Sequence, residues 1–211
     1  MNDFFRHYTR LDQLLMNGFP VVRSSQPPAP YPAADVAEVP LDAGDRRHAA
    51  GLMRVNHAGE IAAQALYRGQ AAVARSPRIR RQMLEAAGEE QAHLAWCARR
   101  LAELDDRPSR LAALWYAGSF AIGAVAGLAG DAASLGFVEE TERQVAAHLE
   151  GHKRELPAGD ARSRAVVNTM QRDEIRHGAN AAAAGARPLP ASLRKLMSAV
   201  AGVMKFGAYR F

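Results

Sequence analysis

The chain has 211 residues, of which 48% are hydrophobic and 23% are charged, and its single cysteine excludes an internal disulfide. This composition is ordinary for a globular protein and excludes disordered and disulfide-rich chains. A formal net charge of +5 favours contact with an anionic partner, either a membrane surface or a nucleic acid. Alanine, arginine and leucine abound and alternating β-branched residues are scarce, so we expect an all-α fold.

Residues 1–45 are expected to form an appendage and residues 46–211 the main domain. Apolar side chains recur at helical spacing within residues 1–20, which predicts an amphipathic helix for packing or membrane contact. The segment between Arg23 and Pro40 contains five prolines, which predict an extended linker or a strap over the domain.

Prolines and glycines divide the rest of the chain into helical segments. The expected helices lie at about 43–75, 77–105, 131–155, 160–184 and 191–206, with an uncharged stretch at 111–130 between the second and the third. The first two and the next two are long enough to form antiparallel hairpins.

The first hairpin contains a lone Glu60 and then the pair Glu90 and His93. The spacing of three residues places Glu90 and His93 one turn apart on the same helical face. Glu60 and Glu90 each lie about fifteen residues from the turn, so the hairpin brings both to one level. His57 lies one turn before Glu60 and could be a ligand, a neighbour of a ligand or a capping residue; we leave it outside the ligand set.

The second hairpin repeats this pattern with a lone Glu142 and then Glu174 and His177. The six side chains from the two hairpins lie within apolar or uncharged stripes, where an unpaired carboxylate is costly. Glu139, one turn before Glu142, competes for the same role. His148 lies about 120° around the helix from Glu142, so a role beside the ligands or in redox relay is open to it.

A ferritin-like di-iron carboxylate bundle takes its ligands from one lone Glu in each hairpin and from two Glu-x-x-His units, and this chain has the same set. Four carboxylates and two imidazoles without thiolate suit two bridged ions, iron or manganese, better than structural zinc. Such a pair of ions points to oxygen activation, with iron oxidation or storage next. Cys97 lies one turn beyond His93 on the same face, and we expect it to be a small buried residue.

The uncharged stretch at 111–130 is long enough to cross a membrane. Crossing would place the two halves of the metal site on opposite sides of the bilayer, so we expect a crossover helix that connects the hairpins. Gly123 and Gly127 have the small-x-x-x-small spacing that permits close contact between helices. The helix at 191–206 is amphipathic and basic, which suits either an anionic membrane surface or packing on the bundle.

Four segments carry a resemblance to a known family: RVNHAGEIAAQALYRGQ, EEQAHL, FVEETERQVAAHL and DEIRHG. From about Gly51 onward the chain resembles the di-iron demethoxyubiquinone hydroxylases of ubiquinone biosynthesis. The resemblance favours Glu142 over Glu139 because Glu142 keeps the family's distance to Val145 and His148. The ligands that it implies are Glu60, Glu90, His93, Glu142, Glu174 and His177.

The resemblance implies hydroxylation of a polyprenylated demethoxyubiquinol by two iron ions, with dioxygen and a reductant, NADH being the candidate, as co-substrates. It also implies a peripheral position on the cytoplasmic face of the inner membrane and contact with other ubiquinone-biosynthesis proteins. The chain departs from some family members at Leu149, where they carry a tyrosine, so the resemblance implies no tyrosine-dependent step at this position.

Two other classes of function compete with this expectation. Another ferritin-like di-iron protein, such as an RNA hydroxylase or a ferroxidase, would use the same ligands. A non-catalytic scaffold that binds quinone or lipid would tolerate the loss of Glu142 or His177. The basic residues lack the interleaved aromatic residues of an RNA-binding surface, and the apolar crossover favours a lipid substrate, so no nucleic-acid partner is expected.

Overall fold

The computed structural model describes residues 29–211, and this part contains six helices and no strand. The helices are α2 (Ala43–Val73), α3 (Pro77–Glu103), α4 (Ala112–Leu128), α5 (Asp131–Glu155), α6 (Ala161–Ala183) and α7 (Ala191–Arg210). The expected all-α fold is confirmed. The helix expected within residues 1–20 lies outside the described residues, and the division at residue 45 stays a prediction.

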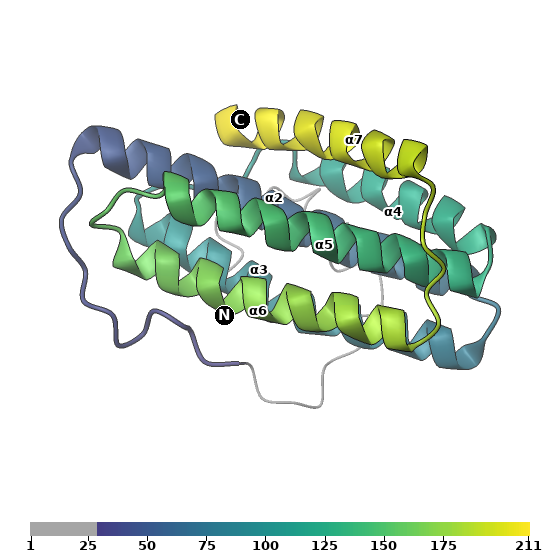
Figure 1. The fold of residues 1–211 in the computed structure, drawn as a ribbon. Helices are drawn as coiled ribbons and strands as arrows, with labels where there is room; N and C mark the ends of the chain where they lie inside the picture. Colours follow the sequence, from purple (N-terminus) through teal and green to yellow (C-terminus); the bar gives the residue numbers. More distant parts are fainter. Residues whose placement is uncertain (1–28) are drawn as a thin grey trace.

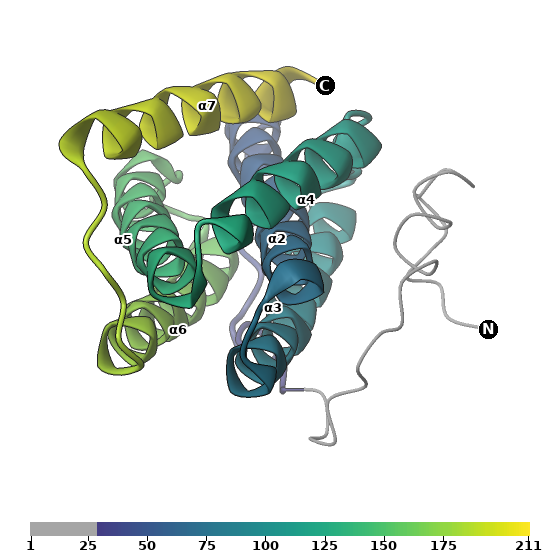
Figure 2. The ribbon, with the colours of Figure 1, turned by 90° about the vertical axis from the view of Figure 1, so that its right-hand side faces the viewer.

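Helices α2, α3, α5 and α6 form a four-helix bundle in which α2 pairs with α3 and α5 pairs with α6 (Figure 1). Figure 2 shows the bundle nearly end-on, with α2 and α5 in a middle layer, α3 and α6 on one side of it, and α4 and α7 on the other. The two hairpins expected from the sequence are therefore the two halves of the bundle.

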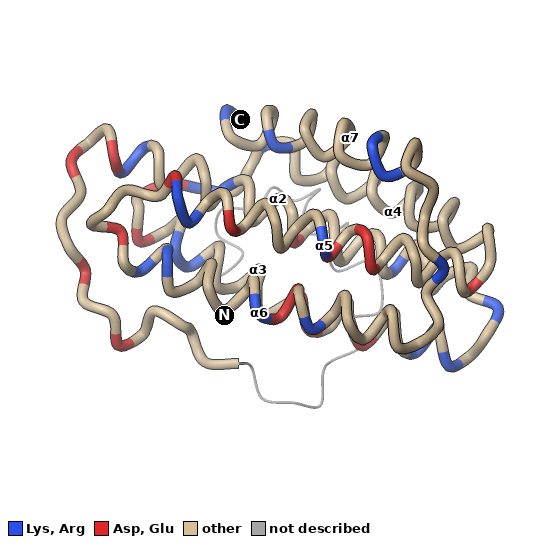
Figure 3. The backbone as a smooth tube through the Cα atoms, in the orientation of Figure 1, with Lys and Arg blue, Asp and Glu red and all other residues tan. Residues whose placement is uncertain are grey.

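Helix α4 is the expected crossover between the hairpins. It packs on α2 along its length, and close approach depends on glycines: a Cβ atom on Gly123 would lie 2.2 Å from the carbonyl oxygen of Leu66. Helix α4 carries no charged residue (Figure 3). Among residues 29–211, no helix is both long and apolar enough to cross a membrane.

Helix α7 runs four residues beyond its expected end at residue 206. Tyr209 explains the extension, because its hydroxyl lies 2.8 Å from His48 Nδ1 and its carbonyl oxygen accepts a hydrogen bond from Arg54. The backbone amide of Arg110 also donates to the carbonyl oxygen of Phe211 at 2.6 Å. These contacts attach the C-terminal end of α7 to α2 and to the segment that precedes α4.

The bundle interior has an apolar cluster on each side of its midpoint. The first includes Met53 and Met170, and the second includes Tyr67 and Met83. Glu60 lies between Met53 and Tyr67 on α2, so the buried acidic residues occupy the gap between the two clusters. Apolar packing on both sides holds the four helices at the level of these polar side chains.

Candidate metal centre

Six buried side chains converge at the middle of the bundle, contributed by all four of its helices. Each is no more than 7% exposed; they are Glu60 on α2, Glu90 and His93 on α3, Glu142 on α5, and Glu174 and His177 on α6. They are the six side chains that the duplicated sequence pattern singled out. The structure thus brings the predicted residues together, and their role as ligands is taken up below as a proposal.

The six side chains form two overlapping groups, each with ligand atoms within 4.8 Å of one another. One group contains Glu60 and His93 and the other contains Glu142 and His177, while Glu90 and Glu174 belong to both. Two carboxylates that are shared between two sites are the arrangement needed to bridge a pair of metal ions.

Each histidine is held between the centre and a second carboxylate. His93 Nε2 donates to Asp173 at 3.1 Å, while its Nδ1 lies 2.9 Å from Glu90. His177 Nε2 donates to Glu89 at 2.8 Å, and its Nδ1 faces Glu90 at 3.2 Å. A carboxylate on Nε2 leaves Nδ1 as the atom available to a metal ion.

Glu89 and Asp173 were not among the residues predicted for the site. Each directly precedes the Glu of a Glu-x-x-His unit and contacts the histidine of the opposite hairpin. The two paired acids, Glu89-Glu90 and Asp173-Glu174, were the available signal. Their partners could not be read from the chain, because these depend on how α3 and α6 are rotated toward each other.

Burial and mutual contact perturb the protonation of the centre. Burial first, then neighbouring negative charge, raises the pKa of Glu60 and of Glu142 well above the usual range of a carboxyl. For His177, burial alone would lower the pKa, but the nearby carboxylates of Glu174, Glu89 and Glu90 outweigh it and raise the pKa to about 12. These three side chains therefore bind protons strongly, and metal ions would displace the protons.

The residues present fit a pair of divalent cations. Glu90 Oε1, Glu142 Oε1, Glu174 Oε1 and His177 Nδ1 are buried without a hydrogen-bond partner among the described residues. Such atoms cost about 1–3 kcal/mol each unless something satisfies them. Four carboxylates also carry four negative charges, which two divalent ions neutralise while both imidazoles stay neutral.

The alternatives raised by the sequence lie outside both groups. Glu139 is partly exposed and belongs to neither group. His57 is fully buried, and burial lowers its pKa to about 3. Cys97 is buried in the first apolar cluster, with its sulfur 3.7 Å from the sulfur of Met170.

A cavity of about 630 Å³ reaches the centre from the α4 and α7 side. Its lining is mainly apolar, comes from α2, α4, α5 and α7, and includes Glu60. His148 also lines it; burial lowers the pKa of His148 to about 4, and its Nε2 has no hydrogen-bond partner among the described residues. Its ring lies 3.9 Å from that of His152.

Comparison with known proteins gives one family and close relatives. Residues 47–207 match the family model described as ubiquinone biosynthesis protein COQ7. The chain is 57% identical to the 3-demethoxyubiquinol 3-hydroxylase of Ralstonia pickettii, over 97% of this chain and 98% of that protein. Enzymes of the same name from Xanthomonas euvesicatoria and Cupriavidus pinatubonensis are 55% and 61% identical, over 97% and 81% of this chain and 96% and 82% of theirs.

Proposed function

Since this chain belongs to the family of the ubiquinone biosynthesis protein COQ7, we propose that it hydroxylates the ring of a polyprenylated demethoxyubiquinol at a di-iron centre. The observation that carries the proposal is the pair of buried groups that share Glu90 and Glu174, one of which contributes Glu60 to the wall of an apolar cavity. We assign Glu60, Glu90, His93, Glu142, Glu174 and His177 as the iron ligands.

The reaction adds one atom of dioxygen to a ring carbon and releases the other as water, with two electrons and two protons from outside the substrate. A pair of ferrous ions held by these six residues would supply electrons to dioxygen, and an external reductant, with NADH as the candidate, would restore them.

The chain's own residues place the substrate and keep water out. The apolar lining, with Leu66 and Met204 among its residues, receives the first part of the isoprenoid tail, and the ring lies beside Glu60, the lining residue that belongs to the centre. His148 is neutral near pH 7 because burial lowers its pKa to about 4. Its Nε2 is therefore free to form a hydrogen bond with a ring hydroxyl of the quinol.

The decisive experiment follows oxygen from the gas into the product. Ferrous-loaded protein, a demethoxyubiquinol with a decyl tail and ¹⁸O₂ should give a product with one labelled oxygen. Glu142→Gln should bind well below the two irons per chain expected of a di-iron bundle and make no product. Glu139→Gln is the matched control, one turn away and outside both groups, and should keep both properties.

Each possible failure has a different meaning. If the wild-type protein binds no metal after anaerobic ferrous loading, the remaining hypothesis is a lipid-binding scaffold. If it binds two irons but gives no labelled quinol, the remaining hypothesis is another di-iron oxidase, such as a ferroxidase.

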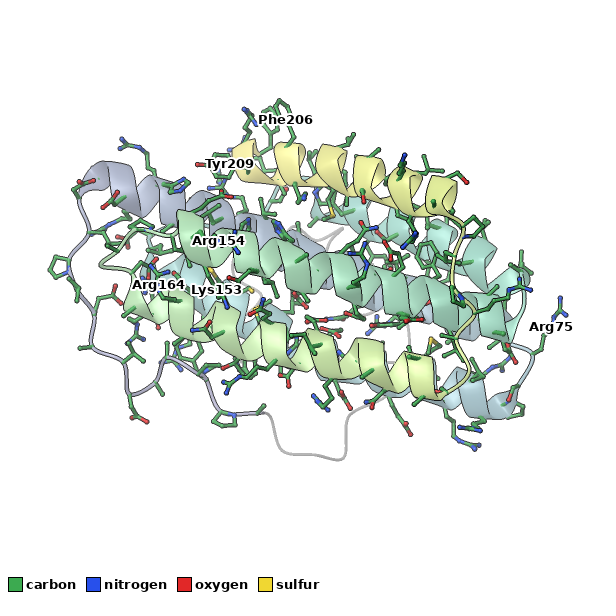
Figure 4. All side chains as sticks on the ribbon, in the orientation of Figure 1. Arg75, Lys153, Arg154, Arg164, Phe206 and Tyr209 are labelled. Carbon is green, nitrogen blue, oxygen red and sulfur yellow. The ribbon has the colours of Figure 1, made fainter. Side chains whose placement is uncertain are left out.

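The site of action proposed is the cytoplasmic face of the inner membrane, with the protein bound peripherally and near other enzymes of the same biosynthesis. Exposed apolar side chains on α4 and α7 support this proposal; they include Val125, Leu128, Val203 and Phe206, each at least 60% exposed. Figure 4 shows Phe206 pointing away from the bundle. A tail that enters between α4 and α7 would reach the cavity from the lipid.

A further inference from the structure

The metal centre has two approaches of opposite chemistry. On one side lies the cavity, whose lining is mainly apolar and includes the amine of Lys205. A divalent cation is disfavoured there, chiefly by the apolar wall and also by this positive charge. On the other side, α3 and α6 run side by side (Figure 1) and carry Glu89 and Asp173.

Glu89 and Asp173 connect solvent to the centre directly. Their side chains are 45% and 28% exposed, and each accepts a hydrogen bond from a histidine that is almost fully buried. Behind Glu89 lies the ring of His177, whose Nδ1 makes no hydrogen bond among the described residues and lies 3.2 Å from Glu90 Oε1 in the centre. Only one imidazole separates a partly exposed carboxylate from the buried ligand atoms.

Arg176 lies across this approach. Its guanidinium is 3.0 Å from Asp173 Oδ1 and 3.8 Å from Glu89 Oε2, so one cation bridges carboxylates from α6 and α3. The side chain is 54% exposed and can swing into solvent without disturbing the core. A metal ion that arrives here exchanges its water for carboxylate oxygens and replaces the guanidinium charge.

On the basis of the metal centre proposed above, we propose that divalent metal ions enter through the seam between α3 and α6. Glu89 and Asp173 are the first contacts of the ion, and Arg176 is the gate that it displaces. The cavity then serves the quinol alone, so metal loading and substrate entry use opposite sides of the bundle.

The test measures Co²⁺ binding to the metal-free full chain by stopped-flow absorption. Arg176→Ala removes the gate, so the association rate and the dissociation rate should both rise about fivefold to tenfold, the effect expected from losing two partly exposed ion pairs. The equilibrium dissociation constant should stay within about twofold, because the gate contacts no ligand atom. That joint change in two rates is not the signature of a residue that merely orients a ligand.

The matched control is Arg172→Ala, which removes the same charge one turn away on α6. Arg172 is exposed, and the side-chain bonds it makes go to Asn168 and Thr169 of its own helix. The cobalt association and dissociation rates of Arg172→Ala should stay within about twofold of wild type.

Two results would overturn the seam as the entry route. One is equal cobalt association and dissociation rates in the two variants, and the other is a weaker equilibrium affinity of Arg176→Ala for cobalt with an unchanged association rate. Wild-type protein that binds no cobalt would overturn the proposed metal centre as well, so the two failures are distinct.

Discussion

Arg100 is a fully buried cation whose partners come from distant parts of the chain. Its guanidinium donates to Ser163 Oγ at 2.9 Å, to Asp160 Oδ1 at 3.0 Å and to Glu38 Oε2 at 2.8 Å. Asp160 also caps α6 by accepting from the amide of Ser163. The network therefore joins α3, the start of α6 and the segment that precedes α2.

Replacing Arg100 with Met should lower the free energy of unfolding by about 3–5 kcal/mol, because the buried carboxylate of Asp160 loses its counter-ion. Urea denaturation of the metal-free protein measures this. Arg99→Met is the control: Arg99 is 55% exposed and pairs with Glu103 at 3.3 Å, so the loss should stay below about 1 kcal/mol. Equal losses in the two variants would show that burial of the guanidinium adds nothing.

The residues of the candidate site differ in how far sequence spacing alone predicts them. Glu90 and His93 could be predicted because a three-residue spacing places them on one face whatever the rest of the fold does. Glu142 needed the resemblance to be chosen over Glu139. Glu89 and Asp173 were missed because an outward acid beside a proposed ligand looks like an ordinary solvated side chain until the opposite helix is in place.

At the scale of helices, α2 and α4 are held together by glycines. A Cβ atom on Gly69 would lie 2.2 Å from the carbonyl oxygen of Phe120, and one on Gly123 would lie 2.2 Å from that of Leu66. Neither backbone can yield locally, because each belongs to a packed helix. The small-x-x-x-small spacing predicted close packing by α4, and its partner proves to be α2 rather than a helix in lipid.

Gly123→Ala should therefore destabilise the protein by about 1–3 kcal/mol, as overpacking separates α2 from α4. Gly118→Ala lies in the same helix with nothing within 4 Å of the new Cβ atom, and should stabilise by up to about 1 kcal/mol through helix propensity. Thermal and urea unfolding of both variants test the opposite signs. A stabilising Gly123→Ala would mean that α4 is free to move away from α2.

Helix ends were predictable where proline or glycine stops the helix and not where tertiary contacts extend it. Helix α3 begins at Pro77, as the sequence predicts, with Ser76 before it. Helix α7 continues past Phe206 to Arg210 because Tyr209 contacts α2, more than 150 residues earlier in the chain. No local pattern encodes that contact.

At the scale of the whole molecule, the layers place two chemistries on opposite sides. The α4 and α7 layer exposes apolar side chains and leads to the cavity, whereas the α3 and α6 layer presents Glu89, Asp173 and Arg176 to water. The periodicity of each helix predicts its apolar stripe. Only the packing of the helices shows which apolar stripes are buried against the bundle and which stay exposed.

Membrane binding through α7 is the prediction that belongs to this scale. The double variant Val203→Glu, Phe206→Glu puts two charges where side chains 68% and 60% exposed would enter the lipid. Each buried apolar side chain contributes about 1.5–3 kcal/mol, so partitioning onto vesicles that contain anionic phospholipid should fall at least tenfold in co-sedimentation.

Ile175→Glu is the matched control, because Ile175 is 59% exposed but lies on α6, on the side away from α4 and α7. The partitioning of Ile175→Glu should stay within about twofold of wild type.

Binding of the wild-type protein to these vesicles should also weaken as salt is added, since Lys195, Lys205 and Arg210 lie on α7 and each basic residue near an anionic surface contributes about 1 kcal/mol. A control that loses about half the partitioning free energy lost by the α7 variant would mean that net charge governs adsorption, and unchanged binding of the α7 variant would move the contact to another face. A loss confined to the α7 variant, with hydroxylation of a decyl-tailed quinol in detergent unchanged, would separate docking on the membrane from the chemistry at the metal centre.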